Sequence, residues 1–195
     1  MKKSFLLLFE SVFLLMLVSL ACVGSNLSTT QPVPSLTSIP EEIKWVIYNN
    51  AELGFSANIP EGWIIEVNPI SQNDPSRGVT WALSPEDIGP DETVIGVTLL
   101  PVIGQLTPSQ LMPLAEQYIE KNTFSIIRPA EETVIDSYPA VWFIGDLNVD
   151  FRSYIAFVST PNGLYALMVG GHQAYEDLIQ YYYDEFINRF SLIDK

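Results

Sequence analysis

Reactive and metal-binding side chains are scarce in this sequence. Its 195 residues include one cysteine, Cys22, and one histidine, His172. A single cysteine excludes an intramolecular disulfide and a cysteine-rich zinc site. Basic residues are also few, since nine Lys and Arg stand against 23 Asp and Glu, for a formal net charge of −14 at pH 7. A chain this acidic repels nucleic acid and anionic lipid headgroups.

Sequence motifs of common enzyme classes are absent as well. The chain has no phosphate-binding loop, no dinucleotide fingerprint and no Gly-x-Ser-x-Gly nucleophile elbow. An enzyme with this sequence would therefore need a site assembled from residues scattered along the chain. The acidic composition itself suits a cationic partner, a metal ion or solubility alone.

The N-terminus has the pattern of a secretory signal peptide. Lys2 and Lys3 form a positive start, and residues 5–20 form an apolar run that is interrupted mainly by Glu10 and serines. We interpret residues 1–21 as a signal peptide and exclude them from the fold.

Cys22 stands where a bacterial lipoprotein signal has its lipid-accepting cysteine. The match is good at Ala21 and Cys22 and weaker at Ser19, where an aliphatic residue is more usual. We expect Cys22 to carry acyl chains such as palmitate, which would anchor the protein to the extracytoplasmic side of a membrane in the bacterial cell envelope. An uncleaved anchor, or ordinary cleavage that leaves a free thiol, are the alternatives.

Composition changes twice along the rest of the chain. Residues 22–43 are rich in Ser, Thr and Pro and predict a disordered tether behind the lipidated cysteine. Residues 44–195 have the length of a single domain and contain no internal repeat.

Period-two alternation and turn residues predict strands through most of this domain. The pattern is clearest at 55–59, where Phe55, Ala57 and Ile59 alternate with polar residues before a Pro-Glu-Gly turn and Trp63. The expected strands are 45–48, 55–59, 63–67, 79–83, 93–102, 131–135, 140–147, 151–159 and 164–169.

Two segments predict helices. The first follows Thr107 as N-cap and Pro108 at the first helical position, with Gln110 completing a capping box and Asn122 as a stop. The second runs over residues 173–189 near the C-terminus. The expected fold class is α+β, an antiparallel sheet with an inserted helix and a C-terminal helix packed on it.

Three stretches resemble the PsbP/Mog1-like fold as it occurs in bacterial lipoproteins of undescribed function. They are Tyr-Asn-Asn-Ala-Glu-Leu-Gly-Phe-Ser-Ala-Asn-Ile-Pro-Glu-Gly-Trp at 48–63, Val-Ile-Asp-Ser-Tyr-Pro-Ala at 134–140 and Phe-Ile-Asn-Arg-Phe-Ser-Leu at 186–192. The resemblance spans the domain and implies a sandwich with a scaffold role, since plant members attach to a photosystem and a fungal relative binds a small GTPase. No functional residue of those relatives matches a position here.

One acidic loop is a candidate calcium site. Glu86, Asp87, Asp91 and Glu92 supply the hard oxygen ligands that calcium prefers. Their spacing is not that of an EF-hand loop, so we favour the alternative, a solvated acidic loop. Calcium is the one cofactor that the sequence offers, and we otherwise expect none.

His172 follows two glycines at the start of the last helix. It is either a general base or ligand exposed in a loop, or a helix-entry residue that bonds nearby backbone, and we favour the second. The first would make the protein a hydrolase with scattered site residues around His172.

Consecutive tyrosines on the last helix are candidates for partner binding. Tyr181 and Tyr183 cannot both face inward together with Tyr182, so we expect one or two of these tyrosines to be partly exposed. They either form a docking patch or flank the core with their hydroxyls in water, and we favour the second. The function that we expect is a non-catalytic binding or assembly module on a membrane, with an unidentified protein or small ligand as partner and no nucleic acid. The alternatives are the hydrolase and a calcium-dependent module that uses residues 86–92.

Overall fold

The computed structural model describes residues 43–68, 79–84, 93–100 and 104–193. The predicted signal peptide, the predicted tether with Cys22 and the acidic residues at 86–92 lie outside these ranges. Among the described residues, no helix is long and apolar enough to cross a bilayer.

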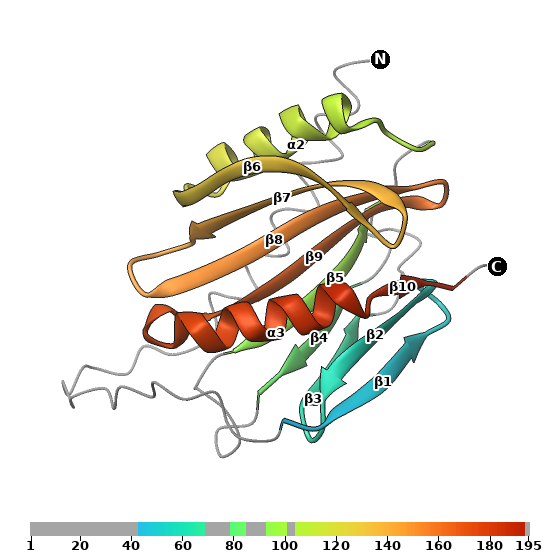
Figure 1. Ribbon diagram of the computed structural model, residues 1–195, viewed down its shortest axis with the longest axis vertical. Helices are drawn as coiled ribbons and strands as arrows, with labels where there is room; N and C mark the ends of the chain where they lie inside the picture. The colour runs from blue at the N-terminus through green and yellow to red at the C-terminus, as the bar shows by residue number, and fades with distance from the viewer. Residues whose placement is uncertain (1–42, 69–78, 85–92, 101–103, 194–195) are drawn as a thin grey trace.

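Seven of the described strands form one antiparallel sheet in the order β3-β4-β5-β9-β8-β7-β6 (Figure 1). The strands are β3 (Ile64–Asn68), β4 (Val79–Leu83), β5 (Val94–Leu100), β6 (Ser125–Ile135), β7 (Tyr138–Asp146), β8 (Phe151–Thr160) and β9 (Gly163–His172). The last four form a meander, in which each strand pairs with the next along the chain. β3 and β6 are the two edges of this sheet.

A second, three-stranded sheet joins the two ends of the domain. It has the order β1-β2-β10, with β1 (Trp45–Asn50), β2 (Phe55–Pro60) and β10 (Ser191–Leu192). The β1–β2 hairpin is also tied to the large sheet, because the Asn50 side chain donates to Thr80 Oγ1 of β4 at 3.0 Å.

The helices begin and end near the residues that their capping patterns indicate. α2 (Pro108–Lys121) follows Thr107, whose N–H donates to Gln110 Oε1 at 2.9 Å, and it stops at Asn122. The short 3-10 helix η1 (Gln173–Tyr175) leads into α3 (Glu176–Asn188). Local capping chemistry therefore predicts these boundaries well.

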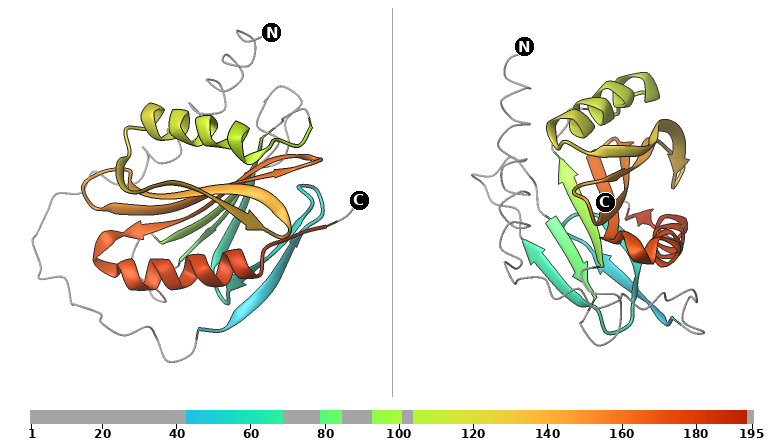
Figure 2. Two further views of the ribbon diagram at one scale, coloured as in Figure 1. Left: turned by 45° about the horizontal axis from the view of Figure 1, so that its top comes forward. Right: turned by 90° about the vertical axis from the view of Figure 1, so that its left-hand side faces the viewer.

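The two α-helices among the described residues, α2 and α3, cover opposite faces of the large sheet (Figure 2). α2 packs on β6, β7 and β8, whereas α3 packs on β8, β9 and the β1–β2 hairpin. Alternate residues of β8 serve the two cores: Ile155 and Phe157 face α2, and Tyr154 and Ala156 face α3. Every residue of β8 is buried, as expected for an interior strand covered on both faces.

Leu53 and Trp63 are part of the core beneath α3. The Trp63 indole meets the Tyr182 ring edge-on, with centroids 5.2 Å apart. Tyr165 adds a buried hydrogen bond from its hydroxyl to the Leu53 carbonyl oxygen at 2.6 Å. Aromatic groups thus anchor the two turns that flank β2, since Tyr165 holds Leu53 in the turn before it and Tyr182 packs on Trp63 in the turn after it.

The expected α+β class is confirmed, with two differences in detail. β6 begins at Ser125 rather than at residue 131, because register shifts at Arg128 and Glu131 let the strand accommodate Pro129. In addition, β1 and β2 pair with β10 in a sheet of their own, whereas the sequence pattern indicated one sheet.

Candidate functional site

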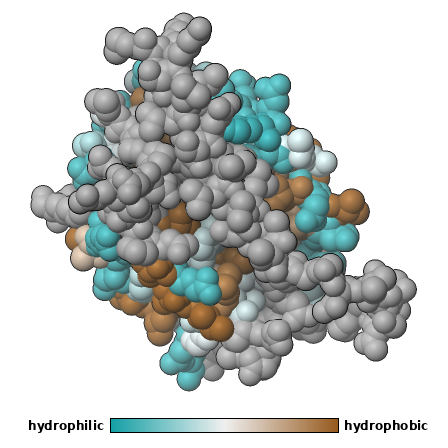
Figure 3. Space-filling view, turned by 180° about the vertical axis from the view of Figure 1, so that it is seen from behind, coloured by the Kyte–Doolittle hydropathy of each residue, from teal (hydrophilic) through white to brown (hydrophobic). Residues whose placement is uncertain are grey.

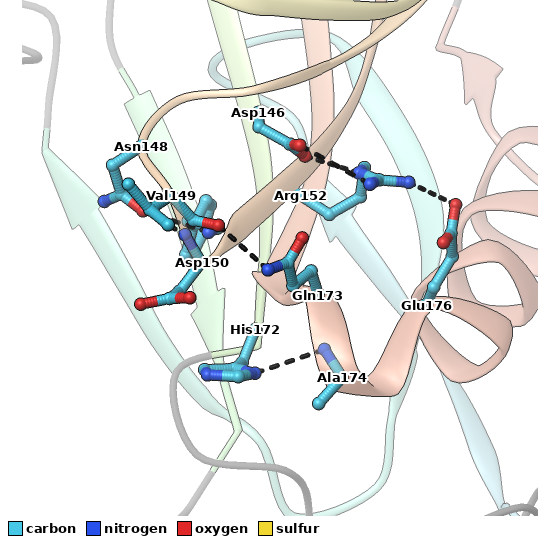
Figure 4. A network of polar contacts seen from close by, with 10 residues as sticks. Asp146, Asn148, Val149, Asp150, Arg152, His172, Gln173, Ala174 and Glu176 are labelled. Atoms are coloured by element: carbon cyan, nitrogen blue, oxygen red, sulfur yellow. Dashed lines mark hydrogen bonds and ion pairs between the residues drawn. The ribbon is translucent and has the colours of Figure 1, made fainter.

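His172 caps the entry to the last helix. Its Nδ1 accepts a hydrogen bond from the Ala174 N–H at 3.2 Å (Figure 4). Its ring meets that of Tyr175 edge-on. The side chain thus does what we favoured from the sequence, which is to bond nearby backbone. Within the described ranges, no three His, Cys, Asp or Glu side chains lie close enough together to hold a metal ion.

A buried arginine lies close to this entry. Arg152 of β8 donates from Nε to Asp146 Oδ1 at 2.5 Å, and Nη1 donates to Glu176 Oε1 (Figure 4). The side chains of Arg152 and Asp146 are 8% and 14% exposed, against 45% for Glu176. Burial alone lowers the pKa of the guanidinium, but its hydrogen bond to Asp146 and the charge of Glu176 raise the pKa above its usual value.

The Arg152 network fastens three elements at one end of the sheet. Asp146 ends β7, Arg152 lies in β8 and Glu176 begins α3. The loop between β7 and β8 is held as well, because Gln173 donates from Nε2 to the Val149 carbonyl oxygen at 2.9 Å. With every charged group engaged inside the network, its arrangement is that of a structural clamp.

Tyr183 is not available for partner binding, which corrects that prediction. It is 7% exposed, because its ring stacks on Trp142 at 6.0 Å and lies 5.3 Å from Tyr154. The Arg128 guanidinium lies over the Trp142 ring, 4.3 Å from its centroid. Burial raises the pKa of both tyrosines, that of Tyr154 to about 12.

Tyr181 remains partly exposed at the surface of α3. Its hydroxyl accepts a hydrogen bond from Trp45 Nε1 at 3.4 Å, and the two rings lie 6.2 Å apart. The sequence argument required at least one tyrosine of the run to be exposed, and Tyr181 meets it. A single half-buried ring already engaged by Trp45 offers little free surface, however.

Exposed apolar side chains gather mainly on the edge strands. They are Val46 and Ile47 on β1, Ile64, Ile65 and Val67 on β3, Ile126, Ile127 and Val134 on β6, and Val149 before β8. Figure 3 shows hydrophobic side chains gathered low on the back of the molecule, on the side where β3 and β4 lie. Strand edges are therefore the main candidates for an interaction surface.

β3 is exposed on both of its faces. Register pairs Ile64 with Leu83 on one face and Ile65 with Ala82 on the other. Ile64 is 55% exposed, Ile65 37% and Val67 43%, and Glu66 between them is exposed too. Among the described strands β3 pairs with β4 alone, so its second edge has no partner strand.

β6, at the opposite edge, has features that discourage pairing. Pro129 lacks an N–H, the register shifts twice around it, and Arg128 forms an ion pair with Glu131 at 2.9 Å. Proteins use proline, charge and irregular backbone in this way to prevent edge-to-edge association. β3 has none of them except the single charge of Glu66, which makes it the candidate site.

The architecture is that of an α+β sandwich with a large antiparallel sheet between two helices. A search of solved structures finds the solution structure of cyanobacterial PsbP (CyanoP) from Synechocystis sp. PCC 6803, with a TM-score of 0.52. The match covers 85% of this chain and 98% of that chain, at 13% sequence identity. The chain therefore has a PsbP-like fold, as its sequence resemblance implied. Neither a scan against protein-family models nor a search of curated proteins finds a match.

Sequence reasoning missed both the Arg152 network and the free edge of β3. Arg152 had a usable signal, since one arginine within the apolar run 151–158 indicates a buried charge with partners. The sequence contains no signal for the free edge of β3, because which strand lies at the edge depends on how all strands of the sheet pair. The Cys22 and 86–92 predictions lie outside the described residues.

Proposed function

We propose that this protein is a membrane-anchored extracytoplasmic lipoprotein that acts as a non-catalytic binding or assembly module. The observation that carries the proposal is the edge strand β3, whose Ile64, Ile65 and Val67 are exposed and which pairs with β4 alone among the described strands. Contiguous exposed apolar groups mark sites of protein association, because leaving them in water is unfavourable. The sequence pattern around Cys22 supports the anchor.

The domain is built to hold such a surface rigidly. β4 pairs with β3 on one side and with β5 on the other along its whole length, and Trp81 of β4 packs closely on Gly96 of β5. A Cβ on Gly96 would lie 2.3 Å from the nearest Trp81 ring carbon. A preorganised surface binds without a large ordering cost, which suits an assembly module.

Crosslinking in cells that naturally make the chain tests this function. A photoreactive phenylalanine analogue replaces Ile65 in the full chain, and a control variant carries it at Gln117 on the exposed side of α2. We expect discrete crosslinked products from position 65 and none from position 117. Equal patterns at both positions, or no product at either, would contradict docking through β3.

A further inference from the structure

The unpaired edge of β3 offers backbone hydrogen-bonding groups to another strand. β3 spans five residues, and within the part of the chain that the structure describes it pairs on one side only, with β4. The N–H and C=O groups on the outer side of such a strand are a template for an incoming extended segment. Strand addition is a common mode of peptide recognition, in which main-chain bonds provide affinity and side chains provide selectivity.

The side chains of β3 define what this incoming strand must carry on its two faces. Ile65 and Val67 point to the face of the sheet that α3 covers. Ile65 pairs with Ala82, which pairs with Ile95 on β5, and Val67 pairs with Thr80, which pairs with Val97. Ile95 and Val97 belong to the core beneath α3. Residues of an added strand on that face would meet apolar groups. β-Branched side chains suit such positions best.

On the other face the incoming strand meets a carboxylate. Glu66 lies in one cross-strand row with Trp81 and Gly96, and it is the only charged residue of β3. A residue directly opposite Glu66 in an added strand would have its Cβ about 5 Å away. At that distance a Lys or Arg attracts the carboxylate, whereas an acidic residue repels it.

A second copy of this chain fits the edge less well than a basic segment does. Each copy carries a net charge of −14 and the same Glu66. Two such surfaces repel one another at long range, while a cationic segment is attracted to the domain before contact. Charge complementarity thus favours a basic segment of a partner protein over a second copy of this chain.

We propose that the free edge of β3 receives an extended, β-branched segment of a partner protein, with a Lys or Arg opposite Glu66. The inference deepens the proposed function and rests on it, since it assigns the chemistry of the partner that docks on β3. It requires no covalent step and no cofactor. The partner strand would become the eighth strand of the large sheet.

Two labelled peptides test the inference on the full chain in phosphatidylcholine nanodiscs, with empty nanodiscs as blank. The basic probe is Val-Thr-Val-Lys-Val-Thr-Val, and the acidic probe has Glu in place of Lys. Fluorescence anisotropy should show tighter binding of the basic probe, by about tenfold in Kd, because one cross-strand charge pair changes from attractive to repulsive. A third probe with Pro at the central position should not bind, since Pro interrupts the ladder.

Charge reversal at the site provides the decisive variant. Glu66→Lys should invert the preference, so that the acidic probe binds more tightly than the basic one. The matched control Glu132→Lys makes the same change on β6, at the opposite edge of the sheet, and should leave the preference intact. Loss of the inversion, or equal effects of both substitutions, would overturn strand addition opposite Glu66.

Two further outcomes separate the possible failures. If the chain forms a dimer in light scattering that Glu66→Lys alters, a second copy occupies β3 and the inference is overturned. If neither probe binds although position 65 crosslinks in cells, docking on β3 stands and strand addition is overturned. If neither probe binds and no crosslink forms, the proposed function fails as well.

Discussion

Among single residues, Arg152 stands out because it is a charged side chain buried together with its partner. Its guanidinium and the Asp146 carboxylate are both largely withdrawn from water, at 8% and 14% side-chain exposure. A buried charge without a partner is far costlier than a pair of buried charges, because its hydration is lost with nothing in return. The attraction between the two charges therefore contributes less to stability than the loss of one partner would cost, because the other charge would stay buried without a partner.

Removing Arg152 should destabilise the fold strongly. We expect Arg152→Ala to lower the free energy of unfolding by about 3–5 kcal/mol, because Asp146 remains buried without its partner. Arg189→Ala is the matched control, since Arg189 forms its 3.2 Å ion pair with Glu185 at the surface, and its loss should cost at most about 1 kcal/mol. Urea unfolding followed by circular dichroism measures both. Equal losses would contradict the clamp.

Tyr182 should make the fold sensitive to alkaline pH. Burial, helped by Tyr181, raises the pKa of its hydroxyl in the folded state to about 12, from a usual value of 10.0. Between these values the unfolded chain holds fewer protons on this group than the folded chain, so stability falls as pH rises from 10 towards 12. Below pH 10 the group contributes its full stabilisation. Urea unfolding at several pH values should show a shallower decline for Tyr182→Phe, and an unchanged slope would refute the assignment.

At the scale of elements, the hairpin from β6 to β7 combines long strands with an unfavourable turn. Its two turn residues, Asp136 and Ser137, have φ angles of 47° and 67°, a region that favours glycine. Asp136 is useful there, because its Oδ2 accepts a hydrogen bond from the Leu192 N–H at 2.8 Å and ties β10 to the turn. For Ser137 no such compensation is visible in a described contact.

Ser137→Gly should therefore stabilise the protein. Relief of about 1–2 kcal/mol of backbone strain exceeds the extra entropy of glycine in the unfolded chain, about 0.4–1 kcal/mol. The net gain should be several tenths of a kcal/mol, and the resulting Asp-Gly pair is a preferred hairpin turn. Gly62→Ala is the opposite control, since its φ of 87° strains any side chain. Thermal unfolding would disprove the argument if Ser137→Gly lowered the midpoint.

The elements show which parts of a fold can be predicted from sequence. Thr107, Gln110 and Asn122 bound α2 through contacts within a few residues, so their pattern is sufficient. Only residues 131–135 of β6 were predicted as a strand, because a proline such as Pro129 usually interrupts one. Pro129 is tolerated here because β6 lies at the edge of the sheet and its register shifts around this residue. Local contacts therefore predict where α2 begins and ends, whereas the extent of β6 depends on its position in the sheet.

Across the whole molecule, the class of fold could be predicted and the candidate site could not. The order of strands and helices, with the resemblance around 48–63, indicates a PsbP-like sandwich, and the match to a solved structure agrees. The exposed edge of β3 follows from pairings between distant segments, such as β5 with β9. Tyr183 is buried for the same kind of reason, because Trp142 and Tyr154 come from two other strands.

The lipid anchor is the prediction that concerns the molecule as a whole. If Cys22 carries the acyl chains, Cys22→Ala removes the only lipidation site that the sequence offers, while the domain from residue 44 onward is untouched. We expect the parent chain to sediment with membranes and to incorporate a palmitate analogue, and the variant to lose the label. The variant should also leave the membrane fraction wherever its leader is still cleaved, and its circular dichroism should match that of the parent. A Cys22→Ala variant that still incorporates the label would contradict lipidation at Cys22. A parent chain that takes up no label but stays in the membrane after alkaline washing would instead identify an uncleaved N-terminal anchor.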